Sequence, residues 1–144
     1  MDTHGRAARR GLAVGVGVAT LLLASLGPGL AEGAKKHATL SVHPPTNAKV
    51  GAPYNIGASG YSGKFNRLLI VGSKVKCPKN AQEAYQTFFG IHTQTVKKQH
   101  NFNRTEPYSA STPGRRNACV YLFDKDHPGG KQKHKSKSYT VSKK

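Results

Sequence analysis

The sequence predicts an all-β protein of six or seven short strands, arranged as a β-sandwich or a small barrel. Short runs rich in β-branched and aromatic residues recur along the chain, and turn residues separate them about every ten positions. Only one segment favours a helix. The chain has 144 residues, which after removal of a leader suits one domain with a single core, here expected from residue 38 to residue 142.

The first 31 residues have the composition of a secretory signal peptide. A positive segment comes first, with Arg6, Arg9 and Arg10, and an uncharged, mostly apolar run follows at 11–26. That run of about 16 residues is shorter than the roughly 20 that a transmembrane helix needs. We therefore expect cleavage after Ala31 or Ala34 and a secreted protein, either released or held at the cell envelope. An uncleaved N-terminal anchor is the alternative.

Alternation of apolar and polar residues predicts the first strands of the domain. Residues 38–43 alternate, and two prolines end the strand. Residues 54–58 alternate in the same way, and the glycine-rich stretch 59–63 that follows is typical of a hairpin turn. A third strand is expected at 66–76, with the apolar run 68–71 as its most buried part.

The second half of the chain begins with the one helical signal. An Asn-x-x-Glu pattern with two alanines predicts a short helical turn at 80–86. One or two exposed strands are expected within 87–102, whereas 104–117 is expected to be a loop because it holds two prolines, a glycine and several hydroxyl residues. A His-Pro-Gly-Gly turn stands at 127–130, and a closing strand is expected at 138–142.

The stretch from Asn117 to Asp124 is expected to be the central strand. One parity holds Ala118, Val120 and Leu122, and the other holds Cys119, Tyr121 and Phe123. A strand that is apolar on both sides is typical of the middle of a sheet that is covered on both faces. We expect it to hold the fold together rather than to form a site.

The two cysteines, Cys77 and Cys119, predict one disulfide, because a secreted chain folds in an oxidising compartment. A reactive or metal-binding thiol is the alternative, but no further ligands or activating groups accompany either cysteine at a suitable spacing. Closing a loop of this length is worth roughly 4 kcal/mol in the chain-entropy model. Cys77 keeps the parity of Leu69 and Val71, so we expect an inward-facing bridge across the sandwich core.

A set of short motifs resembles a known group of proteins. The motifs comprise Gly51, Tyr54, Ile56, Ser59–Gly60, Cys77–Pro78, Cys119, Tyr121–Leu122, Tyr139 and Val141. Over residues 38–142 the chain resembles small exported immunoglobulin-like proteins of high-GC Gram-positive bacteria. The resemblance implies an immunoglobulin-like β-sandwich with one disulfide, and it implies no activity. Antibody domains have a buried tryptophan and a tyrosine two residues before the second cysteine; this chain has no tryptophan and has Asn117 there, so only the broader architecture is implied.

Few residues are available for catalysis or metal binding. The acidic residues beyond the leader are Glu32, Glu83, Glu106, Asp124 and Asp126, and the histidines are His37, His43, His92, His100, His127 and His134. No catalytic or metal-binding motif accompanies them. Asp124 and Asp126 are typical of a solvated turn. We therefore expect no enzyme, no cofactor and no metal site.

Positive charge is the most unusual feature of the chain, which has 23 Lys+Arg against 6 Asp+Glu and a formal net charge of +17. The candidate polyanion-binding residues are Lys131, Lys133, Lys135, Lys137, Lys97, Lys98, Arg115 and Arg116. If residues 131–137 form a strand, its period of two places all four of its lysines on one face.

The charge permits two functional hypotheses. The first is a secreted, non-enzymatic immunoglobulin-like module that associates through a basic face with an anionic partner: an acidic cell-wall polymer, an anionic lipid surface, a glycosaminoglycan or extracellular DNA. Sequence-specific reading of nucleic acid has no motif behind it. The second is a structural or protein-binding domain whose lysines serve only solubility and block edge pairing.

Overall fold

Seven strands and one short helix make up residues 36–144, the part of the chain that the computed structural model describes. The expected signal peptide at 1–31 lies outside the described residues. The elements are β1 (Thr39–His43), β2 (Tyr54–Tyr61), β3 (Arg67–Ser73), α1 (Ala81–Thr87), β4 (Thr93–Thr95), β5 (Asn101–Tyr108), β6 (Gly114–Phe123) and β7 (Lys133–Val141). Within these residues, no helix is long and apolar enough to cross a bilayer.

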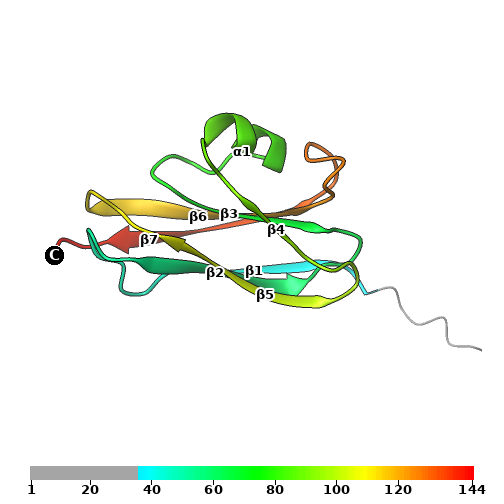
Figure 1. The fold of residues 1–144 in the computed structure, drawn as a ribbon, viewed down its shortest axis with the longest axis horizontal. Helices are drawn as coiled ribbons and strands as arrows, with labels where there is room; N and C mark the ends of the chain where they lie inside the picture. The colour runs from blue at the N-terminus through cyan, green and yellow to red at the C-terminus, as the bar shows by residue number, and fades with distance from the viewer. Residues whose placement is uncertain (1–35) are drawn as a thin grey trace, which may run out of the picture. The chain divides into compact units, whose positions relative to one another are not determined.

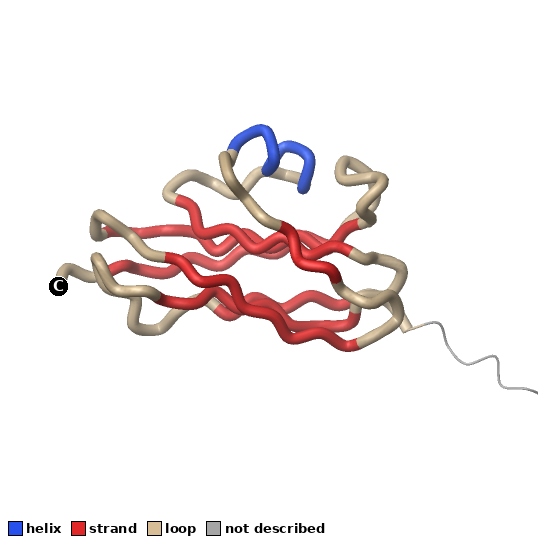
Figure 2. The backbone as a smooth tube through the Cα atoms, viewed as in Figure 1, coloured by secondary structure: helices blue, strands red, loops and turns tan. Residues whose placement is uncertain are grey.

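The strands form two antiparallel sheets that pack face to face, which confirms the predicted all-β sandwich (Figures 1 and 2). One sheet has three strands in the order β1-β2-β5, and the other has four in the order β4-β3-β6-β7. The main core lies between the sheets and is built from alternate residues of their strands. Its largest fully buried side chains include Ile56, Leu68 and Leu122.

Strand β6 is covered on both faces, as its two apolar parities predict. Ala118, Val120 and Leu122 face the three-stranded sheet. On the other side a second cluster contains Cys119, Tyr121 and Phe123, and α1 packs over it (Figure 1). Every residue from 118 to 123 is at most 1% exposed. The central strand of the prediction is therefore the central strand of the core.

Helix α1 forms close to the predicted place. The side chain of Asn80 accepts a hydrogen bond from the Glu83 backbone N–H at 2.8 Å, and the Glu83 carboxylate in turn accepts from the Lys79 backbone N–H at 3.0 Å. These two contacts fix the start of the helix. Ala81 and Ala84 are fully buried against the outer face of the four-stranded sheet.

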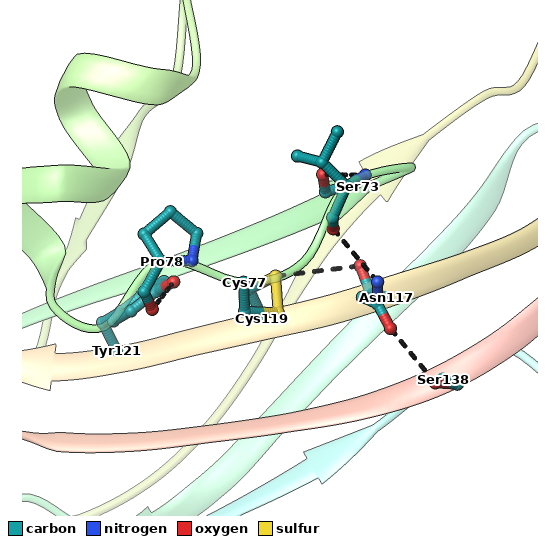
Figure 3. The surroundings of a disulfide bond; sticks show 8 residues. Ser73, Cys77, Pro78, Asn117, Cys119, Tyr121 and Ser138 are labelled. Atoms are coloured by element: carbon teal, nitrogen blue, oxygen red, sulfur yellow. Dashed lines mark hydrogen bonds between the residues drawn. A yellow bond between two sulfur atoms is a disulfide. The ribbon is translucent and has the colours of Figure 1, made fainter.

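The disulfide joins Cys77 to Cys119 as predicted, with 5.6 Å between the two Cα atoms, but its expected position was wrong (Figure 3). It lies on the outer, helix-covered face of the four-stranded sheet and ties the β3–α1 connection to β6. It does not cross the core between the sheets. Beside it, the Tyr121 hydroxyl donates to the Pro78 carbonyl at 2.8 Å (Figure 3).

The reason is that the face shared by Leu69, Val71 and Cys77 is the outer face that α1 covers, and not the face toward the other sheet. Strand β3 also ends earlier than predicted. The Ser73 hydroxyl accepts a hydrogen bond from the Val75 backbone N–H at 3.0 Å, and this turn replaces the strand ladder. Val75 is consequently 55% exposed instead of facing inward. Strand β3 therefore ends at Ser73 instead of running to residue 76, yet Cys77 still lies on the same face as Val71.

The loop expected at 104–117 is mostly strand. Strand β5 runs on to Tyr108, and β6 begins at Gly114, so only 109–113 connects them. Strand β5 is an edge strand, where a proline such as Pro107 costs no ladder hydrogen bond if its nitrogen faces away from the neighbouring strand. The closing strand also begins earlier than expected, because β7 includes the basic stretch from Lys133.

Candidate polyanion-binding surface

Strand β7 places three alternate lysines on one side of its sheet. In the antiparallel register, Lys133, Lys135 and Lys137 lie opposite Leu122, Val120 and Ala118 of β6, in that order. Opposed residues share a face of the sheet. The three lysines therefore lie on the face that holds the main core, like Tyr139 and Val141 further along β7. We call Lys133, Lys135 and Lys137 the lysine row.

The lysine row stays exposed because β7 is the last strand of its sheet. The β6 residues opposite the row are fully buried, and β1 of the other sheet contacts β7. Aliphatic lysine stems can cover the side of such a core while their ammonium groups remain in water. Charges that point inward from an edge strand also hinder pairing with another chain.

Lys131 is not part of the strand, so the predicted row of four lysines is wrong by one. It lies exposed in the β6–β7 turn, just before β7 begins. The turn is fixed to the helix, because the Ala81 backbone N–H donates to the Gln132 side-chain oxygen at 2.9 Å. Lys131 therefore lies just before the first lysine of the row, in a turn that is hydrogen-bonded to α1.

Lys97 and Lys98 lie in the β4–β5 loop, at the end of the four-stranded sheet where β6 ends and β7 begins. Lys98 Nζ is 3.6 Å from Asp124 Oδ2. The Asp126 backbone N–H donates to Asp124, and this hydrogen bond, helped by Lys98, holds the pKa of Asp124 below its ordinary value. Asp124 therefore stays ionised and offsets part of the charge of Lys98.

Arg115 and Arg116 lie at the opposite end of the sandwich. They pair with Thr140 and Tyr139, near the end of β7. The Arg115 guanidinium donates to the Ser138 hydroxyl at 3.1 Å, and the Arg116 guanidinium donates to the Thr112 carbonyl at 3.0 Å. The structure therefore does not gather the eight candidates into one patch: it distributes them along β7 and at its two ends.

Two further lysines, Lys49 and Lys144, lie near the end of β7, and neither was among the candidate residues. Lys49 forms a parallel bridge with Ser142, directly after β7. The Lys144 side chain lies over Gly51, which follows shortly after Lys49 in the β1–β2 connection. No local sequence pattern marks Lys49, because it is brought to β7 only by the packing of one sheet on the other.

The outward register positions of the three-stranded sheet hold no lysine or arginine, and the one lysine placed over this face is Lys36, 4.7 Å from the centroid of the Tyr61 ring at the end of β2. The register places on this face Thr39, Ser41, His43, Asn55, Gly57, Ser59, Tyr61, Asn101, Asn103, Thr105 and Pro107. His43 is the one titratable basic residue among them, and its ring bonds to the Ser59 hydroxyl at 2.7 Å. No helix of the described residues covers this face (Figure 2). The positive charge of the fold is thus concentrated at edges and ends.

On its other side, β7 carries His134, which stacks on Tyr121 with 4.5 Å between the ring centroids and 5° between the planes. Burial lowers the pKa of His134. Burial also raises the pKa of Tyr121, and the nearby Glu83 adds to this. Both rings are therefore neutral near pH 7, and the stack holds the start of β7 against β6 without adding charge.

An open groove of about 430 Å³ lies between the α1–β4 connection and the end of β5. Its walls include Phe88, Ile91, Glu106 and Tyr108, and Phe89 beside it is 99% exposed. The polar groups are already engaged: Glu106 accepts from the Gln94 amide at 2.7 Å, and the Tyr108 hydroxyl donates to a β3 carbonyl. Burial, with Glu106 nearby, raises the pKa of Tyr108 to about 12, so its phenol remains protonated at neutral pH.

Among residues 36–144, no three His, Cys, Asp or Glu side chains gather in a group that could hold a metal ion. Comparison with known proteins gives no relative: no protein-family model matches the chain, and no curated protein matches it.

Proposed function

We propose that this chain is a secreted, non-enzymatic immunoglobulin-like module that associates with anionic cell-surface or extracellular polymers. The observation that carries the proposal is the lysine row on an exposed edge strand. The described residues contain four acids, Glu83, Glu106, Asp124 and Asp126, and their one ion pair joins Lys98 to Asp124. The lysine row has no acidic partner among them, so its charge is available to a ligand.

The order of the strands supports the immunoglobulin-like part of the proposal. If the seven strands are lettered A, B, C, C′, E, F and G, the two sheets become A-B-E and C′-C-F-G. Immunoglobulin-type sandwiches separate A, B and E from C, F and G in the same way. The disulfide differs from the antibody pattern, because Cys119 on the F strand bonds to the connection after C rather than to strand B.

Secretion is supported by two observations. The sequence of residues 1–31 has the composition of a signal peptide, and the disulfide needs an oxidising compartment to persist. Small exported immunoglobulin-like proteins of high-GC Gram-positive bacteria, which the chain resembles, suggest the same location. N-terminal sequencing of the exported protein should begin at Glu32 or Lys35. A sequence that begins at Met1 would instead indicate a retained anchor.

Binding to a polyanion resin tests the proposed association. The protein should be retained on immobilised heparin and on isolated cell wall at low ionic strength. It should elute steeply as salt rises, because binding of its cationic side chains releases counterions from the polyanion and added salt opposes that release. Passage through both columns at low salt would contradict the proposal. Retention that does not change with salt would contradict its electrostatic basis.

A second candidate function is a structural or protein-binding domain, in which the lysine row only protects an open edge. It is favoured by the place of the row on the last strand of its sheet, since inward-pointing charge there prevents pairing between copies. Replacement of the row by glutamine distinguishes the two. Loss of polyanion retention by a protein that stays monomeric supports association, whereas unchanged retention together with self-association supports protection.

A further inference from the structure

The distribution of charge over the sandwich restricts the shape of the anionic partner. A flat anionic surface such as a membrane is bound best by a broad basic face, where each added cation near the surface contributes about 1 kcal/mol. The broad face of the three-stranded sheet has no lysine or arginine at its outward register positions. The broad face of the four-stranded sheet is covered in part by α1 and the connection that leads to it (Figure 1). The outward register positions of the three-stranded sheet therefore do not suit a plane of negative charge. Over the other sheet, the exposed lysines Lys74, Lys76 and Lys79 stand on the β3–α1 connection and not on the strands.

The lysine row is instead a line of charge one strand wide. Alternate residues of a strand are about 6.7 Å apart, so the three lysines of the row span about 13 Å at the start of the nine-residue strand. Lys131 and Lys97 add charge at the start of this line, and Lys49 lies near the end of β7, whereas Arg115, opposite Thr140, lies on the other face of the sheet. Such a line fits an extended chain that carries one anionic group per repeat unit.

The backbone of β7 offers a second kind of contact. On the side away from β6, the strand pairs with no other strand among the described residues, and the bridge between Lys49 and Ser142 comes only after its end. In an antiparallel pair, alternate N–H groups point away from the neighbouring strand. Phosphate oxygens accept hydrogen bonds from both lysine ammonium groups and backbone N–H groups.

The type of cation in the row is compatible with phosphate. Arginine binds carboxylates and phosphates through a planar fork, whereas lysine acts as a point charge and binds phosphate without a fixed orientation. The row contains only lysines, and the arginines at the far end are bonded to Ser138 and Thr112. Evenly spaced point charges can bind successive phosphates of a chain without requiring a fixed orientation of each group.

We infer that the anionic partner is a flexible, single-chain phosphodiester polymer that lies lengthwise along β7, with its phosphates against the lysine row. The inference rests on the proposed function and gives it a ligand class and an orientation. Recognition is through the polymer backbone, so neither bases nor sugars contribute to it.

The test compares three probes with the purified protein: an abasic phosphodiester oligomer, an oligothymidylate of the same length, and phosphatidylglycerol vesicles. The two oligomers should bind alike and much more tightly than the vesicles at equal phosphate concentration. Stacking of bases would make the oligothymidylate at least about tenfold tighter, since each stacked base is worth about 1–3 kcal/mol. That result, or vesicle binding as tight as oligomer binding, would overturn the inference.

Substitutions locate the binding line. Lys→Gln at all three positions of the lysine row should make the slope of log affinity against log salt concentration less negative by about 2. Each phosphate contact on a single strand contributes about 0.7 to that slope, and three contacts are lost. The matched control replaces Lys74, Lys76 and Lys79, which are exposed in the β3–α1 connection, and should flatten it by less than about 1. Lys→Arg at the row should retain binding and shows that the strand tolerates substitution.

Equal slopes for the two glutamine variants would refute the lysine row as the binding line while leaving polyanion association standing. No salt-sensitive binding of any probe by the unaltered protein would refute the proposed function itself.

Discussion

Removal of the disulfide tests how the fold is held together. The variant replaces Cys77 by Ser and Cys119 by Val, because Cys119 is fully buried in β6 and valine is an apolar side chain that suits a strand. The bridge spans 42 positions. The chain-entropy relation then gives a loss of about 4 kcal/mol at 25 °C. Small domains are stable by about 5–15 kcal/mol in total, so this loss removes a large part of the stability.

Guanidinium unfolding followed by circular dichroism and tyrosine fluorescence measures the effect, since the chain has six tyrosines and no tryptophan. The variant should lose about 4 kcal/mol and show a larger m-value, because its denatured state is no longer cross-linked and exposes more surface. The unaltered protein in reductant should show the same loss. A loss below about 1 kcal/mol would refute the view that this connection to β6 restrains the unfolded chain.

Three further predictions concern single side chains. Tyr121→Phe should lower the free energy of unfolding by about 1 kcal/mol, because it removes the part-buried hydrogen bond to the Pro78 carbonyl; an unchanged denaturation midpoint would contradict this. Gly60→Ala should lower the free energy of unfolding by about 3 kcal/mol, because a Cβ there collides with the Thr39 carbonyl. Gly90→Ala is the control: it has open space around it and should cost about 1 kcal/mol. Equal losses of stability in the two variants would be inconsistent with the backbone contact. Burial lowers the pKa of His134, so the folded state binds fewer protons than the unfolded state and loses stability as pH falls below about 6.5. In His134→Gln the fall in melting temperature on acidification should be smaller, and an identical fall would show that this ring does not titrate on unfolding.

Local sequence patterns predicted correctly those strands whose burial in the fold matches their pattern of apolar residues. Residues 118–123 are apolar on both parities, and β6 is buried on both faces because a helix covers the side that the other sheet does not. The alternation at 38–43 likewise reappears as β1, with Leu40 and Val42 inward. The pairing of the cysteines followed from their number and compartment, and needed no knowledge of the fold.

The errors arose where the surroundings of a strand, and not its own pattern, decide the outcome. Cys77 shares the face of Leu69 and Val71 as the pattern predicted, but that face is covered by α1 and does not look toward the other sheet. Pro107 suggested a loop, but an edge strand accepts proline where a central strand does not. Strand order decides both outcomes, and a single sequence of short strands does not determine it.

The candidate surface could be predicted only in part for the same reason. Period two placed the lysines of 133–137 on one face without reference to any neighbour. That this face is the core side of an edge strand depends on the register with β6. The separation of Lys97 and Arg116 to opposite ends of the sandwich depends on the packing of whole sheets, which the spacing of basic pairs along the chain does not encode.

The central claim is that an anionic polymer lies along β7. Titration of the ¹⁵N-labelled protein with the abasic phosphodiester oligomer at low salt tests it most directly. The largest amide shift changes should fall on residues 131–137, with smaller ones at Lys97 and Arg115, and should disappear at high salt. Changes centred on Ser41, Ser59 and Asn103, on the outer face of the three-stranded sheet, or no changes at low salt, would contradict the claim.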